Sequence, residues 1–149
     1  MRLPVCDPPS AAPERWMLDV EVLGAKGAAG APSLAEIRRL CVAAAASAGV
    51  GEGHVAIEFV DARRIAELNA EHRGRPTPTD VLSFPIDGRG PLDGTGQREL
   101  GDVVICAEHT VDLREAVVHG VLHLLGMDHE TDDGEMLTLQ RELLEREGP

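Results

Sequence analysis

The pattern of apolar and polar positions divides the chain, from residue 17 onward, into short strands and amphipathic helices. In residues 17–22, apolar side chains alternate with acidic ones, which is the two-residue period of a half-buried strand. Similar apolar stretches predict three further strands, at 55–59, 80–84 and 101–107.

The first two helices are predicted from their capping residues. Ser33 followed by Glu36 is a capping box, and Gly49 ends the helix that it opens. Asp61 is a favourable N-cap for a second helix, which the prolines of the next segment interrupt.

Two more helices are predicted in the last third of the chain. Residues 113–125 follow a capping Asp112 and are apolar on nearly every side, so this helix belongs in the core. We expect Thr131 to start the last helix, with these side chains facing inward: Met136, Leu137, Leu143 and Leu144. The element order predicts an α+β fold, in which about four helices pack on a small mixed four-stranded sheet.

The length and composition fit one domain. The chain has 149 residues, of which 43% are hydrophobic but only 2% are aromatic, so the core must be aliphatic. Residues 1–16 contain four prolines and little periodicity, and we expect a disordered tail there. The functional domain is therefore predicted over 17–149.

The formal net charge of -12 argues, taken alone, against nucleic acid and against an anionic membrane as partners. A local basic site within the acidic chain stays open. The cysteines Cys6, Cys41 and Cys106 are far apart, which indicates neither a disulfide framework nor a thiolate zinc site and suits a reducing cytosol. We also find no apolar run of membrane-spanning length and no signal-peptide pattern, so the expected location is cytoplasmic.

The most informative motif is HGVLHLLGMDH at 119–129, which holds three histidines within eleven residues. His119 and His123 are four residues apart and therefore share one face of a helix. Gly126 lets the chain leave the helix and turn back, so that His129 can approach the same point. Three imidazoles with one position left for water are the pattern of a catalytic zinc site.

An ordinary alternative is that these histidines are hydrogen-bonded core residues. Each would then need its own polar partner, at about 1–3 kcal/mol for every group left unsatisfied, whereas one shared metal ion satisfies all three. Gly120 stands where the zinc-peptidase motif HExxH has its glutamate base, so peptide hydrolysis is disfavoured.

Together with this motif, PTDVLSFP (78–85) and LGDVVI (100–105) resemble the three signature blocks of the YbeY family. The resemblance covers about residues 17–146. It implies the mixed four-stranded α+β fold and a zinc-dependent, single-strand-specific endoribonuclease that acts in maturation of the 3′ end of 16S rRNA and in ribosome quality control. The implied partners are single-stranded RNA or an rRNA precursor, with the small ribosomal subunit and its assembly proteins.

The resemblance also implies roles for individual residues. It implies one Zn2+ per chain, with His119, His123 and His129 as its ligands, and it places Arg73 in the catalytic cleft beside His119. Arg73 lies near three further arginines (Arg63, Arg64 and Arg75), and its guanidinium suits a phosphate. One departure is a shorter connection between the GDVVI strand and the histidine helix than the family has.

Other polar residues leave alternatives open. Asp128 can orient a ligand imidazole or cap the turn before His129. His109 is expected at the surface, with the cleft as the alternative, and Asp80 and Ser83 are expected to serve turn and strand geometry. His54 and His72 carry no signal in the sequence.

Two mechanisms and two rival functions stay open at this point. A zinc-activated hydroxide could attack the scissile phosphate, or could deprotonate a ribose 2′-OH, with Arg73 offsetting phosphate charge in either case. The rivals are a metallopeptidase-like hydrolase, and a ribosome-assembly factor whose zinc is structural.

Overall fold

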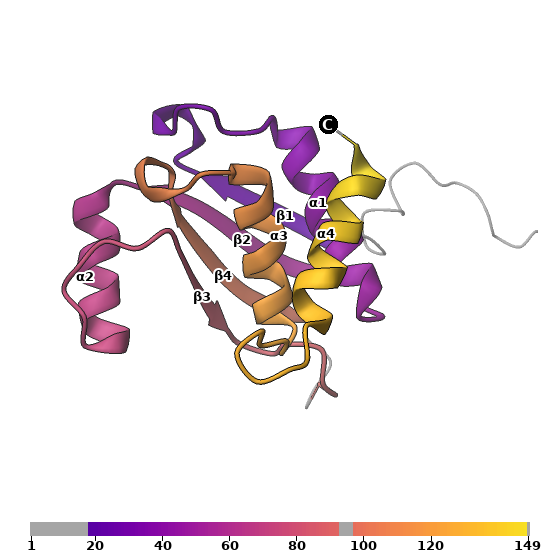
Figure 1. The fold of residues 1–149 in the computed structure, drawn as a ribbon. Coiled ribbons are helices and arrows are strands. Elements are labelled where there is room, and N and C mark those ends of the chain that lie inside the picture. The colour runs from indigo at the N-terminus through magenta and orange to yellow at the C-terminus, as the bar shows by residue number, and fades with distance from the viewer. Residues whose placement is uncertain (1–17, 93–96, 149) are drawn as a thin grey trace, which may run out of the picture.

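Four strands form one mixed sheet in the order β1-β2-β4-β3 (Figure 1). Their bounds are β1 Leu18–Leu23, β2 Gly53–Val60, β3 Val81–Pro85 and β4 Glu99–Cys106. The strands β1, β2 and β4 run parallel, whereas the edge strand β3 pairs with β4 in the antiparallel direction. The computed structural model describes residues 18–92 and 97–148, so the tail predicted over 1–16 lies outside the described residues.

In residues 18–92 and 97–148, four α-helices and two short 3-10 turns accompany the sheet. They are η2 Ala25–Gly27, α1 Leu34–Ser47, α2 Ala62–Arg73, η3 Ala107–His109, α3 Leu113–Leu124 and α4 Glu135–Glu147. The order of strands and α-helices is the one that the sequence pattern predicts, and the α+β class is confirmed. None of the helices in the described ranges is long and apolar enough to cross a membrane.

Three of the helices begin at the N-caps that the sequence predicts. The side chains of Ser33, Asp61 and Asp112 each accept a hydrogen bond from a backbone N–H in the first turn of α1, α2 and α3. These local contacts satisfy donors that the helix itself leaves unpaired, which is why the start of a helix can be inferred from a short stretch of sequence.

The helices cover the two faces of the sheet unequally. α1, α3 and α4 pack over one face and bury an aliphatic core that includes Val103 and Ile105 of β4 (Figure 1). The neighbouring β4 residues Val104 and Cys106 point to the other face, where Ile65 of α2 and Leu82 of β3 cover them. The strands β3 and β4 are therefore enclosed between α3 on one side and α2 on the other.

The prediction that Thr131 starts the last helix is wrong, because α4 begins at Glu135. The carboxylate of Asp132 accepts hydrogen bonds of 2.9 Å from the N–H groups of Gly134 and Met136 and so provides the start of α4. The later start leaves a turn in front of the helix, and that turn carries His129.

The predicted inward face of α4 is correct only in part. Met136 and Leu143 are fully buried, and Leu144 is half-buried against the core. Leu137 is 44% exposed and was wrongly expected inside, whereas Gln140 is only 7% exposed. The buried stripe runs through positions 136, 140 and 143, since these lie on one side of a helix with 3.6 residues per turn.

Candidate metal centre

The three histidines of the sequence motif come together at the end of α3. His119 and His123 project from adjacent turns of this helix, and Gly126 follows it with a φ of 97°, a left-handed conformation that glycine adopts without strain. The chain therefore turns back and brings His129 to the same place. The ring centroids lie 4.8, 5.1 and 5.5 Å apart.

This cluster has the donors of a single metal site. One nitrogen from each ring lies within 4.8 Å of the corresponding nitrogens of the other two, and all three side chains are half-buried. Among residues 18–92 and 97–148, no other group of His, Cys, Asp and Glu side chains meets this condition. Three imidazole nitrogens suit Zn2+ and related transition metals better than Ca2+ or Mg2+, which prefer oxygen.

A buried residue of α4 orients the first of these ligands. The Nδ1–H of His119 donates a 2.8 Å hydrogen bond to the side-chain oxygen of Gln140. An amide oxygen can only accept, so the proton of the neutral His119 ring is held on Nδ1 and Nε2 is left for a metal. Sequence reasoning missed Gln140, because a glutamine on a helix face carries no signal of its partner.

The surroundings of His123 favour its neutral form. Burial lowers the pKa of His123, and the nearby His119 and His129 rings lower it further. A backbone hydrogen bond at Met127 and the charge of Asp128 act in the opposite direction. A metal binds the neutral imidazole, so this environment prepares the ligand for an ion.

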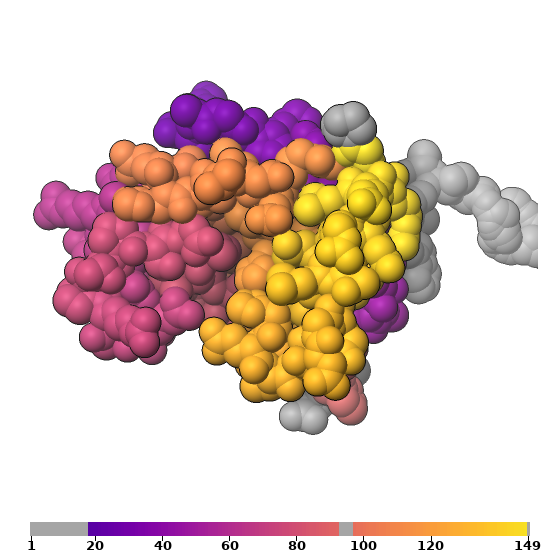
Figure 2. All heavy atoms as spheres, in the orientation of Figure 1, coloured from indigo at the N-terminus to yellow at the C-terminus, as the bar shows by residue number. Residues whose placement is uncertain are grey.

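The histidines lie in a cleft of about 750 Å3 that extends across the edge strand β3. Figure 2 shows the surface hollowed between the pink segment of α2 and β3 and the orange segment that follows α3. The cleft gives the three rings an open side. A metal ion with three protein ligands can therefore keep a position for water or substrate, as catalytic zinc sites do.

Only one of the four arginines predicted near the site reaches the cleft. Arg73, the last residue of α2, lines it and is exposed. Arg63 and Arg64 instead lie 3.8 and 3.2 Å from the carboxylate of Glu67 on the surface of α2, and Arg75 does not line the cleft. The expected concentration of positive charge is therefore reduced to a single guanidinium.

Other predicted polar residues have structural roles. Asp128 caps its own turn, because its carboxylate accepts from the N–H of Glu130 at 3.0 Å. Orientation of a ligand imidazole by Asp128 stays a prediction. Ser83 donates a 3.0 Å hydrogen bond to the carbonyl oxygen of Gly120, and Asp80 accepts from the N–H that begins β3 at 2.8 Å. His109 is exposed outside the cleft, as expected.

Gly120 is packed too tightly to be replaced by the glutamate of a zinc peptidase. A Cβ atom at this position would lie 2.3 Å from Cγ1 of Val103 on β4. Gly120 is buried and faces the sheet, so a larger side chain would separate α3 from β4. The absence of the peptidase base is therefore a consequence of how this helix packs.

One of the two histidines without a sequence signal belongs to the cleft. His72 lines it and lies against the ring of Phe84, with centroids 4.5 Å apart. The contact joins the end of α2 to β3, which are separated by a loop, so residue spacing alone did not indicate it. His54 is elsewhere, between Glu21 and Glu99 on the sheet.

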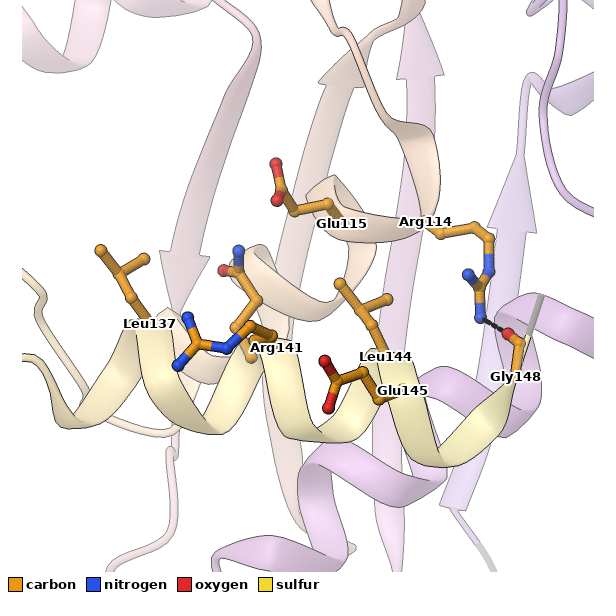
Figure 3. A pocket seen from close by; sticks show the side chains of 8 residues that line it. Arg114, Glu115, Leu137, Arg141, Leu144, Glu145 and Gly148 are labelled. Atoms are coloured by element: carbon orange, nitrogen blue, oxygen red, sulfur yellow. Dashed lines mark hydrogen bonds between the residues drawn. The ribbon is translucent and has the colours of Figure 1, made fainter.

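A second hollow, of about 630 Å3, lies between α3 and α4 (Figure 3). Its lining mixes Glu115 and Glu145 with Arg141, and the nearby Arg114 donates to the carbonyl oxygen of Gly148. Gln140 borders this hollow, but the three histidines do not. Within the part of the chain that the structure describes, the only group suited to metal chemistry therefore lies in the cleft at β3.

Three convergent imidazoles at an open cleft, on an α+β scaffold, are the arrangement of a mononuclear metal-dependent hydrolase. The sequence profile of the family Endoribonuclease YbeY matches residues 33–148. Endoribonuclease YbeY of Bacillus licheniformis is 38% identical over 135 residues, covering 77% of this chain and 85% of the relative. That of Stenotrophomonas maltophilia is 43% identical over 145 residues, covering 85% and 88%. The chain belongs to the endoribonuclease YbeY family.

The comparisons also bear on the length of this chain. Each alignment is longer than the part of this chain that it covers. The two relatives therefore contain residues that have no counterpart here. In this chain, β4 and α3 are joined by only η3 and residues 110–112. That the residues missing from this chain belong to this connection stays a prediction from the sequence.

Proposed function

We propose that this protein is a zinc-dependent endoribonuclease that cleaves single-stranded RNA, with rRNA precursors as its substrates. Membership of the YbeY family makes it a nuclease and hence a hydrolase. The observation that carries the metal-dependent part is the convergence of three imidazole nitrogens within 4.8 Å at an open cleft. His119, His123 and His129 are the proposed ligands.

The charge of the cleft explains why a cation is needed. Among the described residues, its lining contains the carboxylates of Asp80, Asp128 and Glu130 and one guanidinium, that of Arg73. Without a metal ion this surface would repel a phosphodiester, as would the overall charge of -12. A divalent ion held by His119, His123 and His129 would supply positive charge and Lewis acidity in this cleft.

The protein side chains provide positioning and charge. Arg73 lines the cleft at the end of α2, and its planar guanidinium is suited to bind two oxygens of one phosphate and offset the charge that develops on them. Gln140 keeps His119 in the tautomer that presents Nε2. Arg73 and His119 are therefore the residues to which we assign roles in catalysis.

The two rival functions have less support. A metallopeptidase needs a general base next to the first histidine, and the contact between Gly120 and Val103 leaves no room for one. A structural zinc has its coordination sphere closed by protein, whereas these three rings open to a cleft. Binding to the small ribosomal subunit and its assembly proteins, a role in ribosome quality control and a cytoplasmic location remain part of the proposal.

The experiment is cleavage of a labelled single-stranded RNA by the purified, zinc-loaded protein. We expect close to one zinc per chain by elemental analysis, and cleavage that stops with a chelator and returns on adding zinc. His119→Ala should lose both zinc and activity, whereas His109→Ala, at an exposed histidine outside the cleft, should lose neither. RNA that stays intact with zinc-loaded protein would overturn the proposal, and hydrolysis of an unstructured peptide would favour the peptidase.

A further inference from the structure

His72 and Phe84 form a small aromatic surface on the cleft that also holds the three histidines. Their ring centroids are 4.5 Å apart with the planes tilted by 58°. His72 is exposed at the end of α2, next to Arg73, and Phe84 is half-buried on β3. Phe, Trp and Tyr make up only 2% of this chain, so a phenylalanine left half-buried beside the cleft, under an exposed histidine ring, needs a reason.

The two rings lie across the edge strand from the metal centre. Ser83 points toward α3 and bonds Gly120, whereas Phe84 points to the opposite face and packs with Ile65 and Leu82. Since the cleft includes residues on both sides of β3, a ligand that fills it must cross this edge. An extended strand of RNA fits such a path.

From this geometry we propose that His72 and Phe84 are a stacking site for a nucleobase that flanks the scissile phosphate. The inference rests on the proposed function, since it assumes an RNA substrate. The phosphate lies at the histidines and Arg73, and the neighbouring base lies on the exposed face of the His72 ring. Base stacking on an aromatic ring contributes affinity that does not depend on base identity.

The charge of the protein makes such a contact useful. A nuclease of net charge -12 gains little from long-range attraction to RNA, and among the described residues only Arg73 brings a guanidinium to its cleft. Stacking does not release counterions and therefore holds RNA equally well at high salt. It also requires an unpaired base, which would restrict the enzyme to single strands.

An alternative is that His72 only shields Phe84 from water. Three variants separate the two roles. His72→Ala removes both the ring and the shield, His72→Leu keeps an apolar cover without a planar face, and His72→Phe keeps both. His109→Ala is the matched control, since this histidine is also exposed but lies outside the cleft.

The test is steady-state cleavage of a single-stranded RNA by the zinc-loaded proteins, with KM and kcat determined separately. We expect roughly tenfold higher KM for His72→Ala and His72→Leu, with kcat little changed, and near wild-type values for His72→Phe. The KM ratio between His72→Ala and wild type should be the same at low and high salt. RNA with an abasic nucleotide at the stacked position should remove the difference.

Each outcome has a clear meaning. If wild type cleaves RNA and His72→Ala has the same KM on every substrate, the stacking site is wrong and the proposed function stands. If His72→Leu restores KM as well as His72→Phe does, the residue is a shield and the inference also fails. If zinc-loaded wild type neither binds nor cleaves RNA, the proposed function fails and this inference with it.

Discussion

The Nδ1–H of His119 donates a 2.8 Å hydrogen bond to the side-chain oxygen of Gln140, which joins α3 to α4 at the candidate metal centre. Gln140 is 7% exposed, so little water competes for this contact. The bond fixes both the tautomer and the rotation of the ring. Partners of this kind tune metal affinity without touching the ion.

Gln140→Leu should therefore weaken zinc binding by about tenfold or more, because the His119 ring loses its acceptor and its fixed orientation. Gln140→Glu keeps an acceptor at the same place and should bind zinc at least as tightly as wild type. Affinity is measured by competition with a chromophoric chelator. Leu137→Ala, at an exposed site on the same helix, is the control. If Gln140→Leu binds zinc as tightly as wild type, Gln140 does not position His119.

Much of the fold could be predicted because the responsible signals are local. The N-caps at Ser33, Asp61 and Asp112 and the alternation in the strands depend on residues within a few positions of one another. The start of α4 was missed for a related reason. The helix begins after Gly134, which has no side chain to cap it, and the N–H groups of Gly134 and Met136 donate to Asp132, so the residue type of Thr131 misplaced the start.

The same distinction applies to the site. The spacing of the three histidines lies within one helix and its exit turn, so their convergence followed from helix geometry. The contacts of Gln140 with His119 and of His72 with Phe84 join different elements. Such pairs depend on how α4 and α2 are placed by the core, which residue spacing does not report.

Arg73 provides a second prediction. Arg73→Glu should abolish RNA cleavage and Arg73→Gln should slow it by about a hundredfold, because charge on the reacting phosphate loses its partner. Arg73→Lys should be intermediate, since an ammonium lacks the planar fork. Zinc content and melting temperature should not change. Arg63→Gln is the control on the same helix, because Arg63 pairs with Glu67 away from the cleft. If Arg73→Glu protein cleaves RNA at the wild-type rate, Arg73 has no role in catalysis.

His54 predicts a pH-dependent contribution to stability. Its ring forms hydrogen bonds with the carboxylates of Glu99 at 2.8 Å and Glu21 at 3.0 Å. The bond to Glu99 raises the pKa of His54 most, the bond to Glu21 raises it further, and partial burial acts in the opposite direction. A histidine whose folded pKa is raised stabilises the fold fully below the pKa of the unfolded chain, about 6.5, and loses this effect as pH rises through the folded pKa.

His54→Gln should therefore lower the free energy of unfolding more at acidic pH than at pH 9. The difference should be a few tenths of a kcal/mol, since the two carboxylates are 51 and 35% exposed and solvent screens them. Urea denaturation across this pH range measures it. A difference that grows with pH would contradict the sign, and the effect should shrink in a Glu99→Gln background if Glu99 is the main cause.

The contact between Gly120 and Val103 gives the last prediction. Replacing a helix glycine by alanine ordinarily stabilises by about 1 kcal/mol, but here a Cβ would lie 2.3 Å from the Val103 side chain. We expect Gly120→Ala to destabilise by about 1–3 kcal/mol, as overpacked cores do. In Val103→Ala protein, which has space at this position, the same change should cost much less. A double-mutant cycle by urea denaturation measures this coupling. Additive effects would mean that α3 can move away from the sheet at little cost. The steric argument against a peptidase glutamate at position 120 would then fail.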